Sequence, residues 1–293
     1  MGGRRKGFTL IELLVVISII ALLMSIFMPA LRNVRDQAKN SLCMQRLQQW
    51  GVIHSMYAGE YDGHLPGYNF YDGQFMEHAW VNRLYPYAKT FEIYLCPAAT
   101  QMWRYGEGWG KADSAWDFGY LVSGEPSLGE WYDYYNVGTE DRPIFAYGSY
   151  GENAWVADSC FCGENYHDWD NYFRTIRVRN SSRIPVLGDA EWAGGFPYAE
   201  DMPVEVEVRD GIFEGDGEIN RFVHNRHRYS VNWVFLDWSV RKVGLRQLWS
   251  LRWSDQKDEA GNTAWRIPIV PNWNLRADPP WPQWMWSSQN YDL

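Results

Sequence analysis

The longest apolar segment of the chain lies near its amino terminus. From Leu13 to Leu31 no side chain is charged, and only Ser18 and Ser25 are polar. These 19 residues, at about 1.5 Å each, would span roughly 28 Å as a helix, close to the thickness of a membrane's hydrocarbon core. A secretory signal has a shorter apolar stretch followed by a small-x-small cleavage site, which residues 27–32 do not offer. The pattern therefore favours a membrane helix over a removed signal peptide.

Helical spacing continues beyond this segment. Apolar residues recur every three or four positions, at Val34, Ala38, Leu42, Trp50, Ile53 and Met56 or Tyr57. Such a stripe predicts an amphipathic helix that would lay one face on a globular body. We expect it to cover residues 32–60 and to end near Glu60, because Tyr61-Asp62-Gly63 is typical of a turn.

After residue 61 the apolar runs become short and are separated by Gly, Pro, Asp and Asn. The strand candidates are Glu92–Leu95, Ile144–Tyr147, Pro185–Leu187, Val204–Val208, Asn232–Leu236 and Val240–Val243, with a short helix over Val81–Tyr87. The pattern predicts an α+β fold, in which the long helix packs on a small antiparallel sheet with long aromatic-rich loops. The globular domain would cover residues 61–245, and residues 246–293 would form a Trp-rich tail packed on it or extending it.

Composition adds an acidic, aromatic body. The net charge is −9, which argues against nucleic acid as a partner, and 18 Trp and 19 Tyr contribute to an aromatic share of 17 %. The rings could fill the core and brace long loops, or they could form an exposed face for glycans, peptides or neighbouring subunits. Their exposure in the structure distinguishes these two readings.

An acidic residue lies at the edge of the apolar segment. Glu12 follows Phe8-Thr9-Leu10-Ile11, which would extend the same helix, and a carboxylate at membrane depth is unfavourable by a few kcal/mol unless it is paired. It could instead sit at the level of the lipid headgroups. Pro29 lies inside the helical pattern and is expected to kink or locally melt the helix.

Residues 5–13, Arg-Lys-Gly-Phe-Thr-Leu-Ile-Glu-Leu, resemble the processing site of type IV pilins and type II secretion pseudopilins. The resemblance implies that prepilin peptidase cuts between Gly7 and Phe8, removes the basic leader 1–7 and methylates the new amine. It also implies an inner-membrane protein with a cytoplasmic amino terminus, an external body and a fibre-core helix over residues 8–31. In a low-dielectric fibre core, Glu12 of one subunit would neutralise the Phe8 amine of a neighbouring pilin subunit.

Further motifs resemble a subgroup of pseudopilin-like proteins common in planctomycetes. They include Ser41-Leu42-Cys43 on the helix, Cys96-Pro97, and His227 followed nine residues later by Asp237. Trp238 stands where that subgroup has Gly, so the turn there is expected to be of another type or the hairpin to be longer.

The remaining candidates for chemistry are sparse. Cys43 and Cys96 would either form a disulfide between helix and body or remain free buried thiols, and Cys160-x-Cys162 lacks a second pair for zinc. No third metal ligand for His224 and His227 can be recognised from the sequence, so no metal site is predicted there. The acidic loops at residues 168–171 and 214–218 could accept calcium, although they lack EF-hand spacing.

These observations predict a structural subunit and no enzyme, because no serine elbow, paired-carboxylate signature or phosphate loop is recognisable. The predicted function is that of a prepilin-like subunit of a secretion pseudopilus or a type IV pilus-like fibre. The alternative is a membrane-tethered module that binds an extracellular polysaccharide or protein through its Trp and Tyr side chains. A cell-surface hydrolase would need carboxylates that converge in a cleft.

Overall fold

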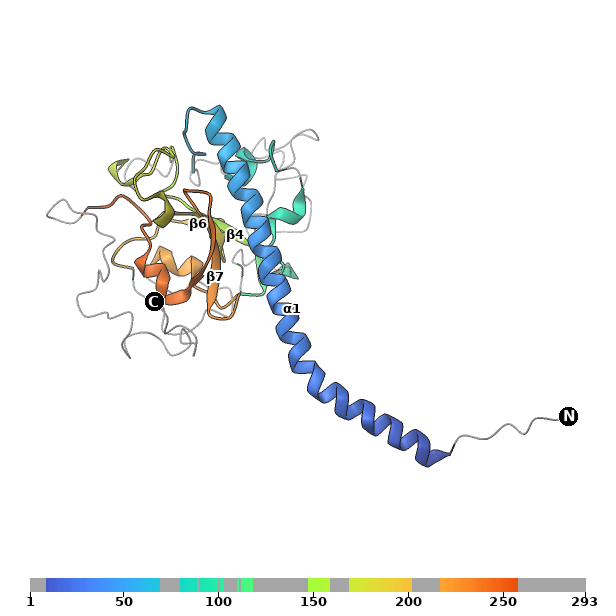
Figure 1. The fold of residues 1–293 in the computed structure, drawn as a ribbon. Helices are drawn as coiled ribbons and strands as arrows, with labels where there is room; N and C mark the ends of the chain where they lie inside the picture. The colour runs from blue at the N-terminus through green and yellow to red at the C-terminus, as the bar shows by residue number, and fades with distance from the viewer. Residues whose placement is uncertain are drawn as a thin grey trace, which may run out of the picture.

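One long helix and a small globular body make up the computed structural model, which describes residues 9–68, 80–88, 90–99, 101–102, 110, 112–117, 147–158, 169–201 and 217–257. Helix α1 covers Leu10–Glu60, and its upper part crosses the body while its lower part projects away from it (Figure 1). The helix ends at Glu60, as the turn at Tyr61-Asp62-Gly63 predicted, and Asp62 has a positive φ of 51°. At about 1.5 Å per residue, its 51 residues extend over roughly 76 Å.

The helix is buried against the body only along its upper half. Its first buried residue is Cys43, and the buried set continues through Leu47, Trp50, Gly51, Ile53, His54, Tyr57 and Ala58. The predicted stripe is confirmed at Trp50, Ile53 and Tyr57. It is wrong at Val34, Ala38 and Leu42, which are exposed, because burial of the helix against the body begins only at Cys43.

Helix α1 continues without interruption through Pro29, so the predicted local melting does not occur. Below the body the helix curves, as Figure 1 shows. A proline removes one backbone hydrogen bond and its ring crowds the preceding turn, which bends a helix without necessarily breaking it.

The central sheet has five strands in the order β6-β4-β5-β7-β8. The strands are β4 (Tyr150–Asn153), β5 (Pro185–Asp189), β6 (Gly194–Gly195), β7 (Ser230–Phe235) and β8 (Val240–Gly244). All neighbours are antiparallel except β4 and β6. The sheet is therefore mixed and not purely antiparallel, because the chain reverses after β5 and lays β6 along the far edge of β4.

Three short strands form a second sheet in the order β1-β2-β3. Its members are β1 (Gln101–Met102), β2 (Ser114–Asp117) and β3 (Tyr147–Gly148), with β1 and β2 parallel and β2 and β3 antiparallel. The remaining described elements are α3 (Trp80–Arg83) and the 3-10 helices η1 (Phe91–Tyr94), η3 (Trp169–Asn171), η4 (Ser181–Arg183), η5 (Glu218–Phe222) and η6 (Leu245–Ser250).

Three strand predictions are confirmed, since β5, β7 and β8 overlap the predicted runs. The prediction at Glu92–Leu95 is wrong. Side chains of α1 satisfy the backbone there, because Trp50 Nε1 donates to the Ile93 carbonyl at 2.7 Å and Arg46 Nη1 donates to the Leu95 carbonyl. The segment therefore forms η1 and does not need a neighbouring strand.

The other predictions have mixed outcomes. The short helix predicted over Val81–Tyr87 is realised as α3, which ends at Arg83. The strand at Val204–Val208 and residues 144–146 lie outside the described residues.

Both faces of the main sheet are covered. On β7, Val234 belongs to the core formed with α1, whereas Trp233 and Phe235 belong to a second core with η5 and η6. This alternation follows from the period of two in a strand. Trp249 and Trp253 are also buried in the second core, so the start of the predicted tail is an integral part of the body.

Candidate functional site

The lower part of α1 presents an apolar surface on all sides. It is the one candidate membrane span among the described residues, with a mean hydropathy of 2.8 in its most apolar window and none of that window buried. Leu10, Ile26 and Leu31, for example, are 78 %, 67 % and 61 % exposed. A helix that is apolar all round requires a membrane or other helices as its surroundings.

The two serines of the apolar run are satisfied within the helix. Ser18 Oγ donates to the Leu14 carbonyl at 2.8 Å, and Ser25 Oγ donates to the Leu22 carbonyl at 2.7 Å. No unpaired hydroxyl would therefore face lipid, which suits the helix for a hydrocarbon environment.

Glu12 caps the start of α1 in the single chain. The backbone N–H of Thr9 donates to Glu12 Oε2 at 2.8 Å, and Thr9 Oγ1 donates to the same oxygen at 2.7 Å. In return, Thr9 Oγ1 accepts from the Glu12 backbone N–H at 3.3 Å, which completes a capping box. Gly7 and Phe8 lie outside the described residues, and the pairing of Glu12 with a neighbouring amine stays a prediction.

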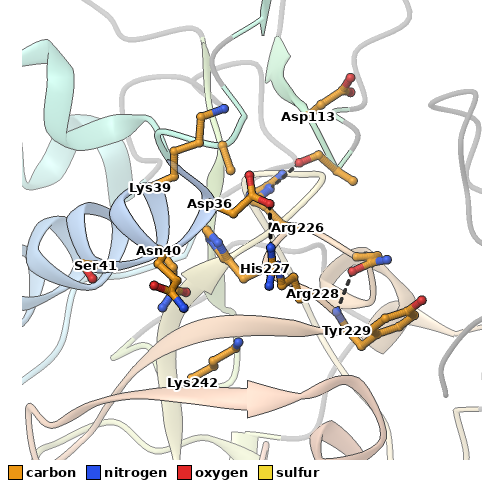
Figure 2. A pocket seen from close by; sticks show the side chains of 14 residues that line it. Asp36, Lys39, Asn40, Ser41, Asp113, Arg226, His227, Arg228, Tyr229 and Lys242 are labelled. Carbon is orange, nitrogen blue, oxygen red and sulfur yellow. Dashed lines mark hydrogen bonds and ion pairs between the residues drawn. The ribbon is translucent and has the colours of Figure 1, made fainter. Parts of the chain in front are cut away.

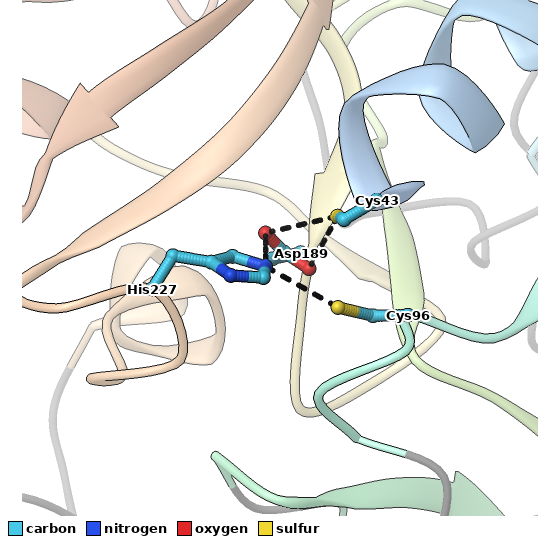
Figure 3. Close-up of side chains that lie close together, drawn as sticks. All are labelled: Cys43, Cys96, Asp189 and His227. Atoms are coloured by element: carbon cyan, nitrogen blue, oxygen red, sulfur yellow. Dashed lines mark hydrogen bonds and ion pairs between the residues drawn. The ribbon is translucent and has the colours of Figure 1, made fainter. Parts of the chain in front are cut away.

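The other notable site is a buried cluster where α1 first becomes buried against the body. Figure 3 shows Cys43 from α1, Cys96 after η1, Asp189 at the end of β5 and His227 before β7, with their side chains converging. All four residues are buried, and one ligand-type atom from each lies within 4.8 Å of the others.

The contacts inside the cluster are short. His227 Nε2 lies 3.3 Å from Cys96 Sγ and 3.3 Å from Asp189 Oδ2, while Cys43 Sγ lies 3.6 Å from Asp189 Oδ1. Two sulfurs, an imidazole nitrogen and a carboxylate oxygen thus face a common centre.

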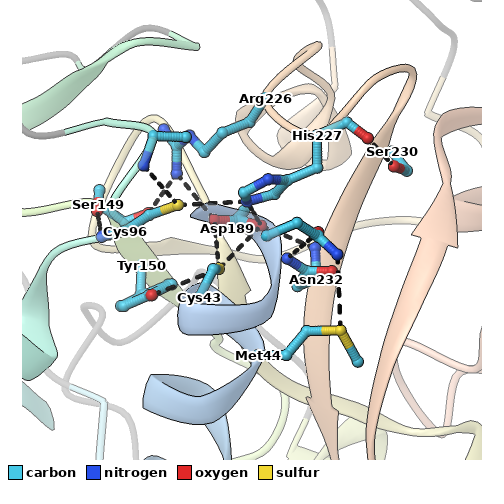
Figure 4. A network of polar contacts seen from close by, with 12 residues as sticks. Cys43, Met44, Cys96, Ser149, Tyr150, Asp189, Arg226, His227, Ser230 and Asn232 are labelled. Carbon is cyan, nitrogen blue, oxygen red and sulfur yellow. Dashed lines mark hydrogen bonds and ion pairs between the residues drawn. The ribbon is translucent and has the colours of Figure 1, made fainter. Parts of the chain in front are cut away.

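Neighbouring groups hold the cluster in place (Figure 4). The backbone N–H of Asn232 donates to Asp189 Oδ2 at 2.7 Å, and Arg226 Nη1 lies 3.3 Å from Asp189 Oδ1. The Tyr150 hydroxyl donates to Cys43 Sγ at 3.4 Å. The side chains of Asp189 and Arg226 are both fully buried, so their opposite charges attract each other in a low-dielectric interior.

The charges set the protonation of the cluster. Burial raises the pKa of Asp189, but His227 and Arg226 outweigh it and hold that pKa well below its usual range. Burial lowers the pKa of His227, but Asp189 and Cys96 raise it to about 9. Burial also raises the pKa of Cys96, yet hydrogen bonds with Cys43 and His227 bring it to about 7, whereas burial keeps the pKa of Cys43 well above its ordinary value.

This arrangement does not form a nucleophile relay. In a catalytic triad the acid and the nucleophile contact opposite nitrogens of the histidine. Here Cys96 and Asp189 both contact Nε2 of His227, and Cys96 has no exposed surface for a substrate. The cluster has the donors of a metal centre or of a redox-active thiol pair, and it lacks the geometry of a nucleophile–histidine–acid relay.

A strained turn positions His227. Arg228 and Tyr229 have positive φ values of 57° and 59°, which are unusual for residues other than glycine. The backbone N–H of His227 donates to the Ser230 carbonyl at 3.0 Å, and Asn225 Oδ1 accepts from the Tyr229 N–H at 2.6 Å. Two consecutive residues in the left-handed region reverse the chain between His227 and Ser230.

A cavity of about 620 Å³ borders the cluster. Figure 2 shows Asp36, Lys39 and Asn40 of α1 on one side and His227, Arg228 and Lys242 on the other. Arg228 closes part of it by contacting Asn33 and Asp36 of the helix. His227 lines this cavity and also belongs to the cluster, so the cavity gives a polar approach to the buried donors.

The predicted site residues fare differently. Cys43 and Cys96 do lie together between helix and body, but both are free thiols in this structure. Asp237 instead caps the β7–β8 turn, where its Oδ1 accepts from the Ser239 N–H at 3.1 Å. The hairpin loop is longer than two residues, because the last paired residues before it are Val234 and Val240. Within the loop, Trp238 has a positive φ of 64°, the conformation that glycine would favour.

His227 is a hydrogen-bonded histidine just before β7, as a histidine at that place in the chain would be expected to be, and its partners are Cys96 and Asp189. Asp189 was not among the residues predicted for a site. Its only signal was a lone acid closing the apolar run Pro185–Gly188, where a polar residue ends a buried strand.

Cys160 and Cys162 lie outside the described residues, as do Asp168 and residues 214–216 of the two acidic loops. The rest of the first loop forms η3, and Glu218 of the second begins η5.

The described tryptophans favour the structural reading of the aromatics. Six of them are fully buried: Trp50, Trp80, Trp116, Trp155, Trp233 and Trp253. Most of them pack edge-to-face with other rings, such as Trp50 against Tyr94 at 4.9 Å between centroids. The Trp-rich segment 273–286 lies outside the described residues.

Comparison with known proteins gives one finding, at the amino terminus. No curated protein and no solved structure matches the chain. Residues 2–28 match the family model of the prokaryotic N-terminal methylation motif. This segment includes Gly7, Phe8 and Glu12 and runs into the exposed apolar part of α1. The chain thus begins with a type IV pilin-like prepilin motif.

Proposed function

We propose that this protein is a prepilin-like structural subunit of a type II secretion pseudopilus or a type IV pilus-like fibre. Prepilin peptidase would cut after Gly7 and methylate the amine of Phe8. The inner membrane would hold the precursor, with its amino terminus in the cytoplasm and its body outside.

The observation that carries this proposal is the position of the methylation motif on a helix that is apolar all round. The segment Leu10–Leu31 would extend over about 33 Å, enough to cross a bilayer. The same surface would pack against the helices of other subunits once the chain leaves the membrane. Both environments satisfy an apolar helix, so one surface can serve before and after assembly.

The body supports a structural role as well. Six of its tryptophans are fully buried, and its Cys-His-Asp cluster lacks the geometry of a nucleophile relay. The alternative function, an extracellular polysaccharide- or protein-binding module, would need several open rings on one surface, which the six fully buried tryptophans do not supply.

Processing is tested by mass spectrometry of the mature amino terminus in cells that contain a prepilin peptidase. The expected chain begins at Phe8 and carries one additional methyl group. Gly7→Glu should leave the precursor uncut, whereas Gly3→Glu, a matched change within the same leader, should not. Cleavage of Gly7→Glu at the normal position would refute the assigned cut site.

Assembly is tested by a pair of substitutions at Glu12. Glu12→Gln keeps the ability to cap the Thr9 backbone but removes the negative charge, and Glu12→Ala removes both. If the charge pairs with the amine of a neighbour, both variants should be processed and neither should form fibres. Glu92→Gln, an exposed acid on the body, is the control. Normal fibres from Glu12→Gln would contradict the charge pairing.

A further inference from the structure

We propose that Cys43, Cys96, Asp189 and His227 form a structural zinc site that fastens α1 to the body. Each residue comes from a different part of the fold: α1, the segment after η1, the end of β5 and the turn before β7. Zinc in proteins is bound by cysteine sulfur, histidine nitrogen and carboxylate oxygen, which are the donors present here.

The spacing of the donors suits a tetrahedral ion. Zinc–ligand bonds of about 2.0–2.3 Å give distances of roughly 3.3–3.8 Å between neighbouring ligand atoms of a tetrahedron. The His227–Cys96 and His227–Asp189 distances are both 3.3 Å, and the Cys43–Asp189 distance is 3.6 Å. The remaining pairs lie within 4.8 Å, so small side-chain rotations would complete the shell.

The charges of the site also balance with the ion in place. Two thiolates, one carboxylate and Zn²⁺ sum to one negative charge, and the buried guanidinium of Arg226 beside Asp189 compensates for it. Arg226 is itself held by the carbonyls of Ala112 and Ala190, at 3.0 and 3.1 Å. A neutral arrangement suits a fully buried position, where an uncompensated charge is strongly unfavourable.

Outer contacts fix the ligands as they do at known metal centres. Asn232 N–H donates to Asp189, Tyr150 O–H donates to Cys43, and the Ala98 N–H donates to Cys96 Sγ at 3.5 Å. These donors would stabilise negative charge on the ligands.

The site would be structural and not catalytic. All four positions would be occupied by protein atoms, and all four residues are buried, whereas a catalytic zinc keeps an open position. The cavity beside His227 would admit the ion during loading. A zinc ion at this site would cross-link Cys43 of the helix to three parts of the body.

The metal content of the detergent-solubilised full chain tests the proposal. After reduction of the thiols, loading with zinc and removal of excess, elemental analysis should find about one zinc per chain. Cys96→Ser and His227→Gln should lose most of this zinc. His64→Gln, which alters a half-exposed histidine paired with Asp158, should retain it.

If the variants fail to fold, cobalt loading of the wild-type chain provides a second test. The wild-type chain loaded with Co²⁺ should show the visible absorption of a tetrahedral site together with thiolate-to-cobalt charge transfer. Zinc that persists in a Cys43→Ser/Cys96→Ser double variant overturns the proposal. So does a native chain without zinc that contains a Cys43–Cys96 disulfide in its unreduced peptides. These measurements use single subunits, so they are independent of fibre assembly.

Discussion

Trp50 is the main anchor of α1 on the body, and its truncation gives the most direct test of the packing. The side chain is fully buried, and its indole N–H donates to the Ile93 carbonyl at 2.7 Å. Its ring packs edge-to-face against Trp80 and Tyr94, with centroids at 5.2 and 4.9 Å. Removing a buried tryptophan destabilises a protein by about 3–5 kcal/mol, which lowers the melting temperature of a body this size by roughly 10 °C.

A second substitution separates the two contributions. Trp50→Phe keeps most of the ring contacts but leaves the Ile93 carbonyl without its donor, at a cost of about 1–3 kcal/mol. The order of stability should therefore be wild type, Trp50→Phe, then Trp50→Ala.

Thermal unfolding of the full chain in detergent, followed by near-ultraviolet circular dichroism, measures these differences. Val52→Ala is the matched control, because Val52 lies on the same helix but is 53 % exposed, and alanine is the better helix former. It should melt at or slightly above the wild-type temperature. A Trp50→Ala protein that melts within about 2 °C of the wild type would refute the assignment of this anchor.

Three further changes have expected outcomes, each measurable by the same unfolding assay. Gly188→Ala should destabilise the body by about 1–3 kcal/mol or more, because a Cβ there would lie 2.3 Å from Trp233 Cδ2. Gly59→Ala should instead stabilise it by about 0.5–1 kcal/mol, since nothing lies within 4 Å of the added carbon, and a loss would contradict this. Burial raises the pKa of Asp201 to about 7, so the folded carboxyl keeps a proton that the unfolded chain loses above about pH 4. Stability should fall between about pH 4 and pH 7, and Asp201→Asn should flatten that slope; an unchanged slope would contradict the assignment.

The elements that could be predicted from the sequence are those with a strong local period. The apolar run and the three-to-four spacing predicted α1 and its end at Glu60, and short apolar runs predicted β7 and β8. The failure at Glu92–Leu95 has a non-local cause. Trp50, more than 40 positions earlier, supplies a hydrogen bond that a neighbouring strand would otherwise provide.

The candidate site was predictable only in parts. Cys43, Cys96 and His227 were singled out for separate reasons, as a disulfide pair and a family signature. Their meeting with Asp189 depends on the register of α1 against the sheet and on the left-handed backbone at Arg228 and Tyr229. Neither feature has a sequence signal, because positive φ at those residues violates the usual preference for glycine.

The start of the contact between α1 and the body has a mechanical consequence. An exposed ion pair between Arg228 and Asp36 comes first along the helix, and such pairs contribute little. Cys43 is the first buried residue, and the buried row continues to Ala58. Tension pulled along the helix axis would therefore load this row in shear, and its contacts would have to slide together instead of opening one at a time.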